Sequence, residues 1–212
     1  MKIAMIGSGA VGQTLAAGFL RHGHQVRIAT RDPGKLADFA KANPAVGIGE
    51  IGDVAAWADL AVLSVKGTAA IAALAPAAAA LAGKVVIDTT NPIADAPPQN
   101  GVLTYFTKAN DSLGEQLQAA YPALRFVKAF NSVGSGFMVN PSFAGGKPTM
   151  FIAGNDERAK ADVSAIIDQF GWETADMGSI LSSRAIEPLC QLWCLPGFIR
   201  NEWNHAFKLV KT

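Results

Sequence analysis

The sequence predicts an α/β fold built on a doubly wound, mostly parallel sheet, followed by a short helical segment at its C-terminal end. Two observations carry this prediction. Short apolar runs that end in Gly, Asn, Asp or Pro alternate along the chain with stretches of helical periodicity. The first run leads into "MIGSGAVGQTL", residues 5–15, which spaces Gly7, Gly9 and Gly12 as in the phosphate-binding turn of a Rossmann-type fold.

The alternation of runs and periodic stretches places the elements in order. The predicted strands are 2–7, 25–30, 60–65, 84–90, 125–131, 149–155 and 174–178, with a further short segment at 46–49. The predicted helices are 11–22, 34–42, 53–58, a pair between 69 and 82, 112–121, 156–170, and 182–212 with a break at Pro196 and Gly197. This order indicates parallel strands with helices on both faces. We expect residues 1–180 to bind the nucleotide and residues 181–212 to pack on them in one compact unit.

The composition limits the classes of partner. The chain has 212 residues and is 50% hydrophobic, so it is long enough to bury a core. Its 18 Lys and Arg nearly balance 17 Asp and Glu, which argues against nucleic acid and favours a small molecule as partner. The Ala-rich run 68–83 contains Pro76 and is too weakly apolar for a membrane span. Because a strand is predicted from Lys2, leaving no room for a signal peptide, we expect a cytoplasmic protein.

Two cysteines, Cys190 and Cys194, are four residues apart and so lie on one face of a predicted helix. Without a nearby His they make a poor metal site, because tetrahedral zinc usually takes four ligands. We expect free thiols in a reducing compartment and no bound metal. Apolar residues of the same segment predict a homodimer contact. They are Leu189, Leu192, Trp193, Leu195, Phe198 and Ile199.

The glycine turn supplies the first candidates for cofactor binding. Gly7 ends the first predicted strand and Gly12 falls in the first turn of the next helix, which is the placement that the motif requires. Gly9 lets the backbone approach a pyrophosphate, and the free N–H groups at the helix N-terminus attract its charge. The predicted pyrophosphate-binding residues are Gly7, Ser8, Gly9, Ala10, Val11 and Gly12.

The end of the second predicted strand indicates which nucleotide binds. An NAD site usually has Asp or Glu about 20 residues beyond the motif, but residues 25–31 are QVRIATR, with no acid before Asp32. Thr30 and Arg31 instead supply a hydroxyl and a guanidinium, which suit a 2′-phosphate, and Lys35 adds a second cation. We therefore predict NADP rather than NAD, with Asp32 as the N-cap of the following helix.

Ligands of open parallel sheets bind outside the carboxyl ends of the strands, so the residues there are further candidates. Ser64, Val65 and Lys66 follow one predicted strand. We expect Val65 to face a ring and Lys66 to contact either phosphate or water. Asn91 and Asn131 follow two others, where they hold a carboxamide or a second ring, or serve as turn residues.

Groups for strong proton transfer are missing from these positions. His22 and His24 precede the second predicted strand and His205 lies near the C-terminus, so we expect surface histidines. No Tyr-x-x-x-Lys, no Ser-His-Asp order and no clustered pair of carboxylates is visible. Direct hydride exchange between two redox rings requires mainly that they be held face to face, so it suits a site without catalytic side chains.

Four stretches of the chain are diagnostic together: IGSGAVGQTLAAGFLRHGHQVRIATRDP at the start, VVIDTTNP at 85–92, FVKAFNSVG at 126–134 and DMGSILSSRAIEPL at 176–189. They resemble the NADP oxidoreductases that depend on the deazaflavin coenzyme F420, whose fold also forms the cytosolic reductase domain of the STEAP metalloreductases. The resemblance implies NADPH with its nicotinamide near Asn91 and the segment Ala129–Asn131. It also implies a flavin or deazaflavin ring stacked on the nicotinamide, near residues 133–137 and the C-terminal helices.

We therefore expect an NADPH-dependent oxidoreductase that passes hydride between NADP(H) and a flavin-like acceptor. An imine or 2-hydroxyacid reductase, which shares such an N-terminal domain but has a long helical C-terminal domain, is one alternative. A redox sensor that binds NADP without turnover is the other. A screen of NADPH oxidation with flavins, deazaflavin, quinones and ferric chelates separates the enzyme from the sensor.

Overall fold

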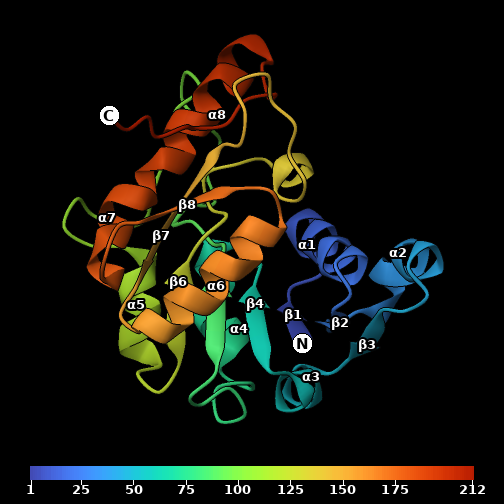
Figure 1. Cartoon of the computed structure of the whole chain (residues 1–212). Coiled ribbons are helices and arrows are strands. Elements are labelled where there is room, and N and C mark those ends of the chain that lie inside the picture. Colours follow the sequence, from blue (N-terminus) through green and yellow to red (C-terminus); the bar gives the residue numbers. More distant parts are fainter.

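The computed structural model describes residues 1–212 and contains one eight-stranded sheet, in the order β3-β2-β1-β4-β5-β6-β7-β8 (Figure 1). The strands are β1 (Lys2–Ile6), β2 (Gln25–Ala29), β3 (Gly47–Gly49), β4 (Leu60–Leu63), β5 (Val85–Asp88), β6 (Arg125–Lys128), β7 (Thr149–Gly154) and β8 (Glu173–Asp176). Strands β1 to β6 are all parallel. The predicted doubly wound, mostly parallel sheet is confirmed.

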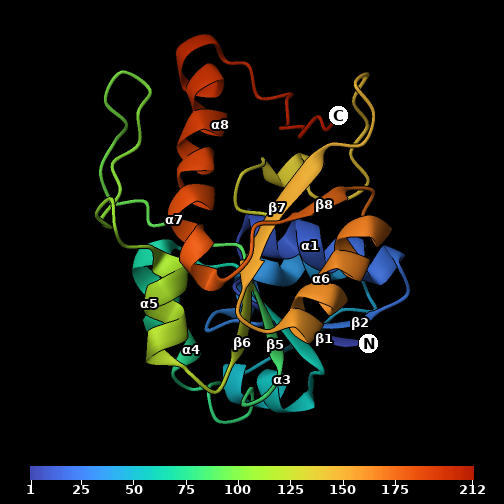
Figure 2. The same ribbon diagram turned by 60° about the vertical axis from the view of Figure 1, so that its left-hand side comes forward.

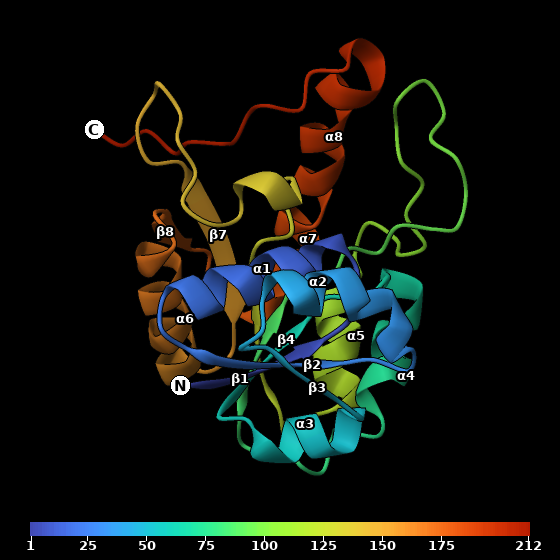
Figure 3. The same cartoon turned by 90° about the vertical axis from the view of Figure 1, so that its right-hand side faces the viewer.

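Helices cover both faces of this sheet, as predicted. The α-helices are α1 (Ala10–Arg21), α2 (Ala37–Ala42), α3 (Ile51–Trp57), α4 (Ala70–Leu74), α5 (Leu113–Ala120), α6 (Glu157–Gln169), α7 (Ser183–Ile186) and α8 (Pro188–Arg200). Short 3-10 turns are η1 (Pro33–Leu36), η2 (Gly67–Ala69), η3 (Ser135–Phe137) and η4 (Ile180–Ser182). Figure 3 shows α1 and α2 on one side of strands β1–β3 and α3 on the other.

Alternation of side chains along the strands builds two separate cores. In β1, Ile3 and Met5 are buried with residues of α1 and α6, whereas Ala4 and Ile6 are buried with residues of α3, α4 and α5. Burial of apolar surface on both faces stabilises the sheet by roughly 25 cal/mol per Å². The strands are thereby held rigidly, and their carboxyl ends can position loops.

Two acidic residues start helical segments, as predicted. The carboxylate of Asp32 accepts a hydrogen bond from the Gly34 N–H at the start of η1. The carboxylate of Asp156 accepts one from the Ala159 N–H, at 2.8 Å, at the start of α6. Each satisfies a donor that the first helical turn leaves without a partner.

The sheet reverses direction at β7. This strand pairs antiparallel with β6, with Val127 opposite Gly154 and Lys128 opposite Ala153, and β8 pairs parallel with β7. An antiparallel neighbour needs no crossover helix. The connection 129–148 therefore begins and ends at the edge of the sheet where β6 ends.

The Ala-rich run forms one short helix rather than the predicted pair. Helix α4 ends at Leu74, and residues 75–83 continue as turns that bury Ala77 and Leu81. Pro76 lacks the N–H that a continuing helix requires. None of the helices in the structure combines the length and the apolar character needed to cross a bilayer.

The predicted break at Pro196 and Gly197 is wrong. Helix α8 continues through both residues to Arg200, and Asn201 ends it in the left-handed conformation with φ of 55°. Gly197 is buried against the ring of Trp203, which approaches so closely that no side chain fits between them. Packing of the following residues on this part of α8 therefore offsets the hydrogen bond that the proline removes.

Residues 201–212 are not helical, contrary to the prediction for 182–212. They fold back over α8, where the Trp193 indole N–H donates to the His205 carbonyl at 2.8 Å. They then reach the start of β7, where the Thr149 N–H donates to the Phe207 carbonyl. Figure 2 shows α8 extending beyond the sheet, with this tail returning toward β7.

Candidate functional site

A cavity of about 630 Å³ lies at the carboxyl ends of β1, β4 and β5. Its lining comes from the start of α1, the loop after β4, the end of β5 and the following loop. The fold brings together there five of the predicted site residues. They are Val11, Ser64, Val65, Lys66 and Asn91. Sequence reasoning missed the loop 93–97, which lines the opposite wall and carries no chemical motif.

The three glycines of the turn differ in what a side chain would meet at each position. Gly7 has φ of 126°, and a Cβ there would overlap the Ser64 carbonyl. A Cβ on Gly12 would overlap the Gly7 carbonyl oxygen. At Gly9, however, no atom beyond its two chain neighbours lies within 4 Å of the position that a Cβ would take. Packing therefore explains Gly7 and Gly12 but leaves the space beside Gly9 free for a ligand.

The N-terminus of α1 has no partner within the chain. Its N-cap, Gly9, has no side chain to accept hydrogen bonds, and the first turn contains no acidic residue. The first N–H groups of a helix have no intrahelical acceptor and carry a partial positive charge. Ser8 and Ala10 flank Gly9 in the same turn. This arrangement suits the pyrophosphate of a dinucleotide.

The residues predicted to bind a 2′-phosphate lie beside this turn. Thr30 Oγ1 lies 3.3 Å from Ser8 Oγ and accepts a hydrogen bond from the Asp32 N–H. Arg31 is exposed and forms no hydrogen bond or ion pair within the chain, whereas Lys35 pairs with Asp32 at 3.6 Å. The guanidinium of Arg31 is thus the cation free to bind phosphate oxygens.

The loop after β4 forms one wall of the cavity. Ser64 is buried, and its hydroxyl donates to the Ile6 carbonyl at 3.3 Å. Val65 is half-buried and presents an apolar side chain. The ammonium of Lys66 lies 3.2 Å from Asp95 Oδ1, so it links this wall to the loop after β5.

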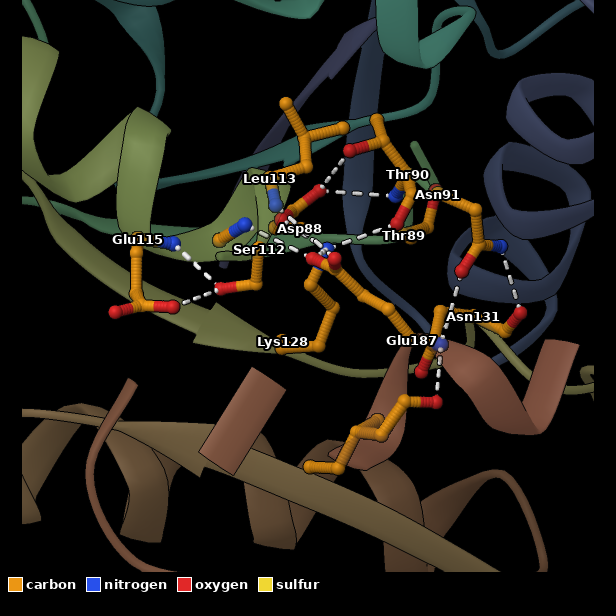
Figure 4. A network of polar contacts seen from close by, with 12 residues as sticks. Asp88, Thr89, Thr90, Asn91, Ser112, Leu113, Glu115, Lys128, Asn131 and Glu187 are labelled. Carbon is orange, nitrogen blue, oxygen red and sulfur yellow. Dashed lines mark hydrogen bonds and ion pairs between the residues drawn. The ribbon is translucent and has the colours of Figure 1, made fainter. Parts of the chain in front are cut away.

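The two predicted asparagines are joined to each other at the end of the cavity (Figure 4). Asn91 Nδ2 donates to the Asn131 carbonyl at 2.8 Å, and Asn131 Nδ2 donates to Asn91 Oδ1 at 3.0 Å and to the Ile186 carbonyl at 3.1 Å. Asn131 is 4% exposed and Ala129 is fully buried. Asn91 therefore faces the cavity, while Asn131 and Ala129 lie behind it and do not line it.

Phe130 turns the chain between these residues. Its φ of 59° is an outlier for a bulky side chain. The Phe130 N–H donates to Met150 Sδ at 3.1 Å, and the buried ring packs against Phe170. The surrounding core holds a conformation that local sequence disfavours. This turn ends β6 and lets Asn131 reach Asn91.

A buried lysine lies next to the asparagine pair (Figure 4). Lys128 Nζ lies 2.6 Å from Asp88 Oδ2 and 2.9 Å from Glu187 Oε1, and it donates to the Thr90 carbonyl at 2.8 Å. Burial alone lowers the pKa of Lys128, but the charges of Asp88 and Glu187 outweigh burial and raise the pKa above its ordinary value. The ammonium is thus charged; it forms ion pairs with both carboxylates and donates one hydrogen bond, to the Thr90 carbonyl.

This network corrects the expectation that no carboxylates cluster. Asp88, Lys128 and Glu187 belong to the diagnostic stretches at 85–92, 126–134 and 176–189. Each follows an apolar residue, Ile87, Val127 or Ile186, and this is the sequence signal of its burial. Because both carboxylates are bound to the lysine, neither is a free general base.

No histidine lies at the cavity, which agrees with the prediction. His22 and His24 are half-buried rather than fully exposed, and they hydrogen-bond to Asn140 and Gln169 on the other side of α1. His205 stacks on Trp193 of α8, with ring centroids 5.0 Å apart. The cavity therefore supplies positioning groups rather than an evident proton donor.

Comparison with known proteins places this chain among reductases. Residues 2–92 match the family of coenzyme F420-dependent NADP oxidoreductases. The chain is 36% identical to a candidate F420-dependent NADP reductase from Arthrobacter sp. FB24, whose crystal structure it matches with a TM-score of 0.92 over 100% of both chains. It is 27% identical over 195 residues to the metalloreductase STEAP3 of Rattus norvegicus. That match covers 89% of this chain and 36% of the metalloreductase, so the chain spans about a third of that protein's length.

An imine reductase from Streptomyces aurantiacus has a similar fold. The TM-score is 0.68 at 16% identity, over 94% of this chain and 63% of the imine reductase. Such low identity shows the shared fold and not a shared reaction. The full-length identity to the Arthrobacter protein, by contrast, shows kinship. The chain belongs to the family of coenzyme F420-dependent NADP oxidoreductases.

Proposed function

We propose that this NADP-dependent oxidoreductase transfers hydride between NADP(H) and a flavin or deazaflavin acceptor. The observation that carries the proposal is the unpartnered surface beside the glycine turn. There the N-terminus of α1 is uncapped, the space at Gly9 is open, and Arg31 has no partner. These three features together fit a dinucleotide with a 2′-phosphate.

The cofactor lies in this proposal along the edge of the sheet, from the glycine turn to Asn91. Residues Gly7 to Gly12 bind the pyrophosphate through backbone N–H groups. Thr30 and Arg31 bind the 2′-phosphate, with Lys35 as a second, more weakly placed cation. The exposed pair of Lys66 and Asp95 spans the cavity that the cofactor enters.

The nicotinamide end lies in this proposal between Val65 and Asn91. NADPH supplies a hydride when it is bound, and the chain's own residues orient it. Val65 gives an apolar surface for a ring, and Ser64 fixes the strand end behind it. The amide of Asn91 is held by Asn131 and can bond a carboxamide. Hydride transfer between two stacked rings requires this positioning and little acid–base chemistry.

The test is a comparison of cofactors and acceptors. Calorimetric titration with NADPH and with NADH should show tighter binding of NADPH. Stopped-flow mixing of the NADPH-bound protein with F420, FMN, FAD or a ferric chelate should oxidise NADPH with a deazaflavin or flavin, and deuterium at the transferred position should slow the step. Absence of NADPH binding overturns the proposal, and binding without turnover identifies a sensor.

We propose that the protein is a homodimer in the cytoplasm. Leu192, Phe198 and Ile199 of α8 are exposed by 54%, 43% and 58%, which supports an apolar contact surface. Trp193 does not belong to that surface, because it is buried against Gly134. The thiols of α8 are free, which suits a reducing compartment. Light scattering that gives a monomer mass overturns the dimer.

A further inference from the structure

We propose that Lys128 is a positioning residue for the nicotinamide end of the cofactor, and that through Glu187 it couples this end to the start of α8. This inference rests on the proposed function, because it requires a dinucleotide in the cavity. Lys128 touches no cavity surface itself, since its side chain is fully buried. It acts through Thr90, the residue before Asn91.

Every polar group of Thr90 is bound to the network. Asp88 Oδ1 accepts hydrogen bonds from the Thr90 N–H at 2.9 Å and from the Thr90 hydroxyl at 2.6 Å. Lys128 donates to the Thr90 carbonyl at 2.8 Å. Thr90 and Asn91 both line the cavity. The Asn91 carbonyl lies so close to Gly67 that a side chain at position 67 would overlap this carbonyl. The ion pair thus fixes the backbone that carries the Asn91 amide.

Glu187 ties the same lysine to two helices. Its carboxylate accepts hydrogen bonds from the Leu113 and Gly114 N–H groups, at 3.0 and 2.9 Å, at the start of α5. Glu187 also directly precedes Pro188, where α8 begins, and its carbonyl accepts from the Tyr105 hydroxyl at 2.7 Å. One ammonium therefore joins the end of β5, the start of α5 and the start of α8.

A second buried lysine offers a matched control. Lys160 is 5% exposed, and its ammonium lies 2.8 Å from both Glu157 Oε1 and Asp176 Oδ2. This pair lies near Asp156, which contacts Arg125 at the start of β6, whereas Lys128 lies at the end of the same strand. Lys160 is therefore also a buried lysine between two carboxylates, although Glu157 and Asp176 are more exposed than Asp88 and Glu187, and it lies away from the cavity.

The experiment compares two ligands on Lys128→Met and Lys160→Met. NADPH reaches both ends of the proposed cofactor site, whereas 2′,5′-ADP contains adenosine with its 2′-phosphate and a single 5′-phosphate, and has no nicotinamide. In calorimetric titrations, Lys128→Met should bind NADPH about tenfold more weakly while its affinity for 2′,5′-ADP stays within about twofold. Lys160→Met should bind both ligands as the wild type does. If Lys128 has a merely structural role, Lys128→Met should lose affinity for both ligands to the same extent.

Glu187→Gln covers the case in which Lys128→Met does not fold. This variant keeps the lysine but removes the negative charge of one of its two partners. It should bind NADPH about threefold more weakly than the wild type, while its affinity for 2′,5′-ADP stays unchanged. The proposal is overturned if the folded variants at 128 or 187 change the two affinities equally, or not at all. If the wild-type protein binds NADPH no more tightly than 2′,5′-ADP, the proposed function is overturned instead.

Discussion

The two ends of the proposed cofactor site are built in different ways. The glycine end, made of the turn Gly7–Gly12 with Thr30 and Arg31, comes from one short stretch of chain and depends on absent side chains and free donors. The asparagine end, made of Asn91 and Asn131 with the network of Lys128, gathers residues from distant stretches whose polar groups bond to one another.

This difference predicts which kind of substitution disrupts each end. At the glycine end, added volume at Gly7 or Gly12 is harmful, because backbone atoms already occupy the space of a side chain there. At the asparagine end, a removed polar group is harmful, because it leaves a buried partner without a hydrogen bond. Substitutions of the two kinds therefore break the site in ways that binding and stability measurements can separate.

The largest effect is expected for Gly12→Val. Its side chain would overlap the Gly7 carbonyl and the Ser64 hydroxyl, so we expect the free energy of unfolding to fall by about 3 kcal/mol, and NADPH binding to be lost. Urea denaturation and calorimetry measure the two quantities. Gly145→Val is the control, because Gly145 is exposed and no atom beyond its chain neighbours lies within 4 Å of an added Cβ. A stable Gly12→Val that binds NADPH would contradict the importance given to the turn.

Arg31→Ala tests the charge at the glycine end without adding volume. Loss of a charge-assisted hydrogen bond to phosphate should weaken NADPH binding roughly 10- to 100-fold. Binding of NADH and the free energy of unfolding should stay unchanged, because Arg31 has no partner in the chain. Arg158→Ala, an exposed arginine on α6, is the matched control. Equal losses for NADPH and NADH would show that Arg31 does not select the 2′-phosphate.

Asn131→Ala probes the asparagine end. It removes the donor to Asn91 Oδ1 and to the Ile186 carbonyl, so unfolding should become easier by about 1–2 kcal/mol. Hydride transfer in a single turnover should slow more than NADPH binding weakens. Asn110→Ala, at an exposed turn, should change neither. If the variant transfers hydride at the wild-type rate, Asn131 serves only the packing of the fold.

The smallest effect is expected at the outer margin of the asparagine end, where Arg184 of α7 holds Glu115 of α5 with N–O distances of 2.8 and 2.7 Å. The hydrogen bond from Arg184 lowers the pKa of Glu115 below its ordinary value. The ionised pair stabilises the protein fully when the pH is above the ordinary pKa of a glutamate. This contribution is lost as the pH falls through the lowered pKa of Glu115. Glu115→Gln should cost less than about 1 kcal/mol at neutral pH.

Urea denaturation of Glu115→Gln at several acidic pH values checks the sign of this effect. The variant should lose less stability than the wild type as the pH falls, because it has no carboxylate to protonate. Curves for the two proteins that stay parallel down to strongly acidic pH would mean that this pair contributes nothing measurable to the contact between α5 and α7.

The glycine end could be predicted from sequence because its signals are local. Turn, strand end and helix start lie within residues 2–31, and the caps Asp32 and Asp156 also act on their immediate neighbours. The asparagine end could be predicted only in part. Asn91 and Asn131 follow strands, but nothing in their spacing shows that they bond to each other.

The network and the C-terminal segment escaped prediction for physical reasons. Asp88, Lys128 and Glu187 meet only because three parts of the fold converge, so no window of sequence contains the pairing. The continuation of α8 through Pro196 depends on a tail that returns from beyond the helix. In both cases long-range contacts override the local preference.

The reversed strand β7 gives the fold a place where it can vary. Because β7 runs against β6, the connection 129–148 leaves and re-enters the sheet at the edge where β6 ends. Its length can change without any change in strand order, and under the proposed function each change would alter the surroundings of the acceptor rather than those of the cofactor phosphates. One antiparallel pairing thus separates strands β1 to β6, whose ends carry the glycine turn and Asn91, from a connection whose length can vary by evolution or by design.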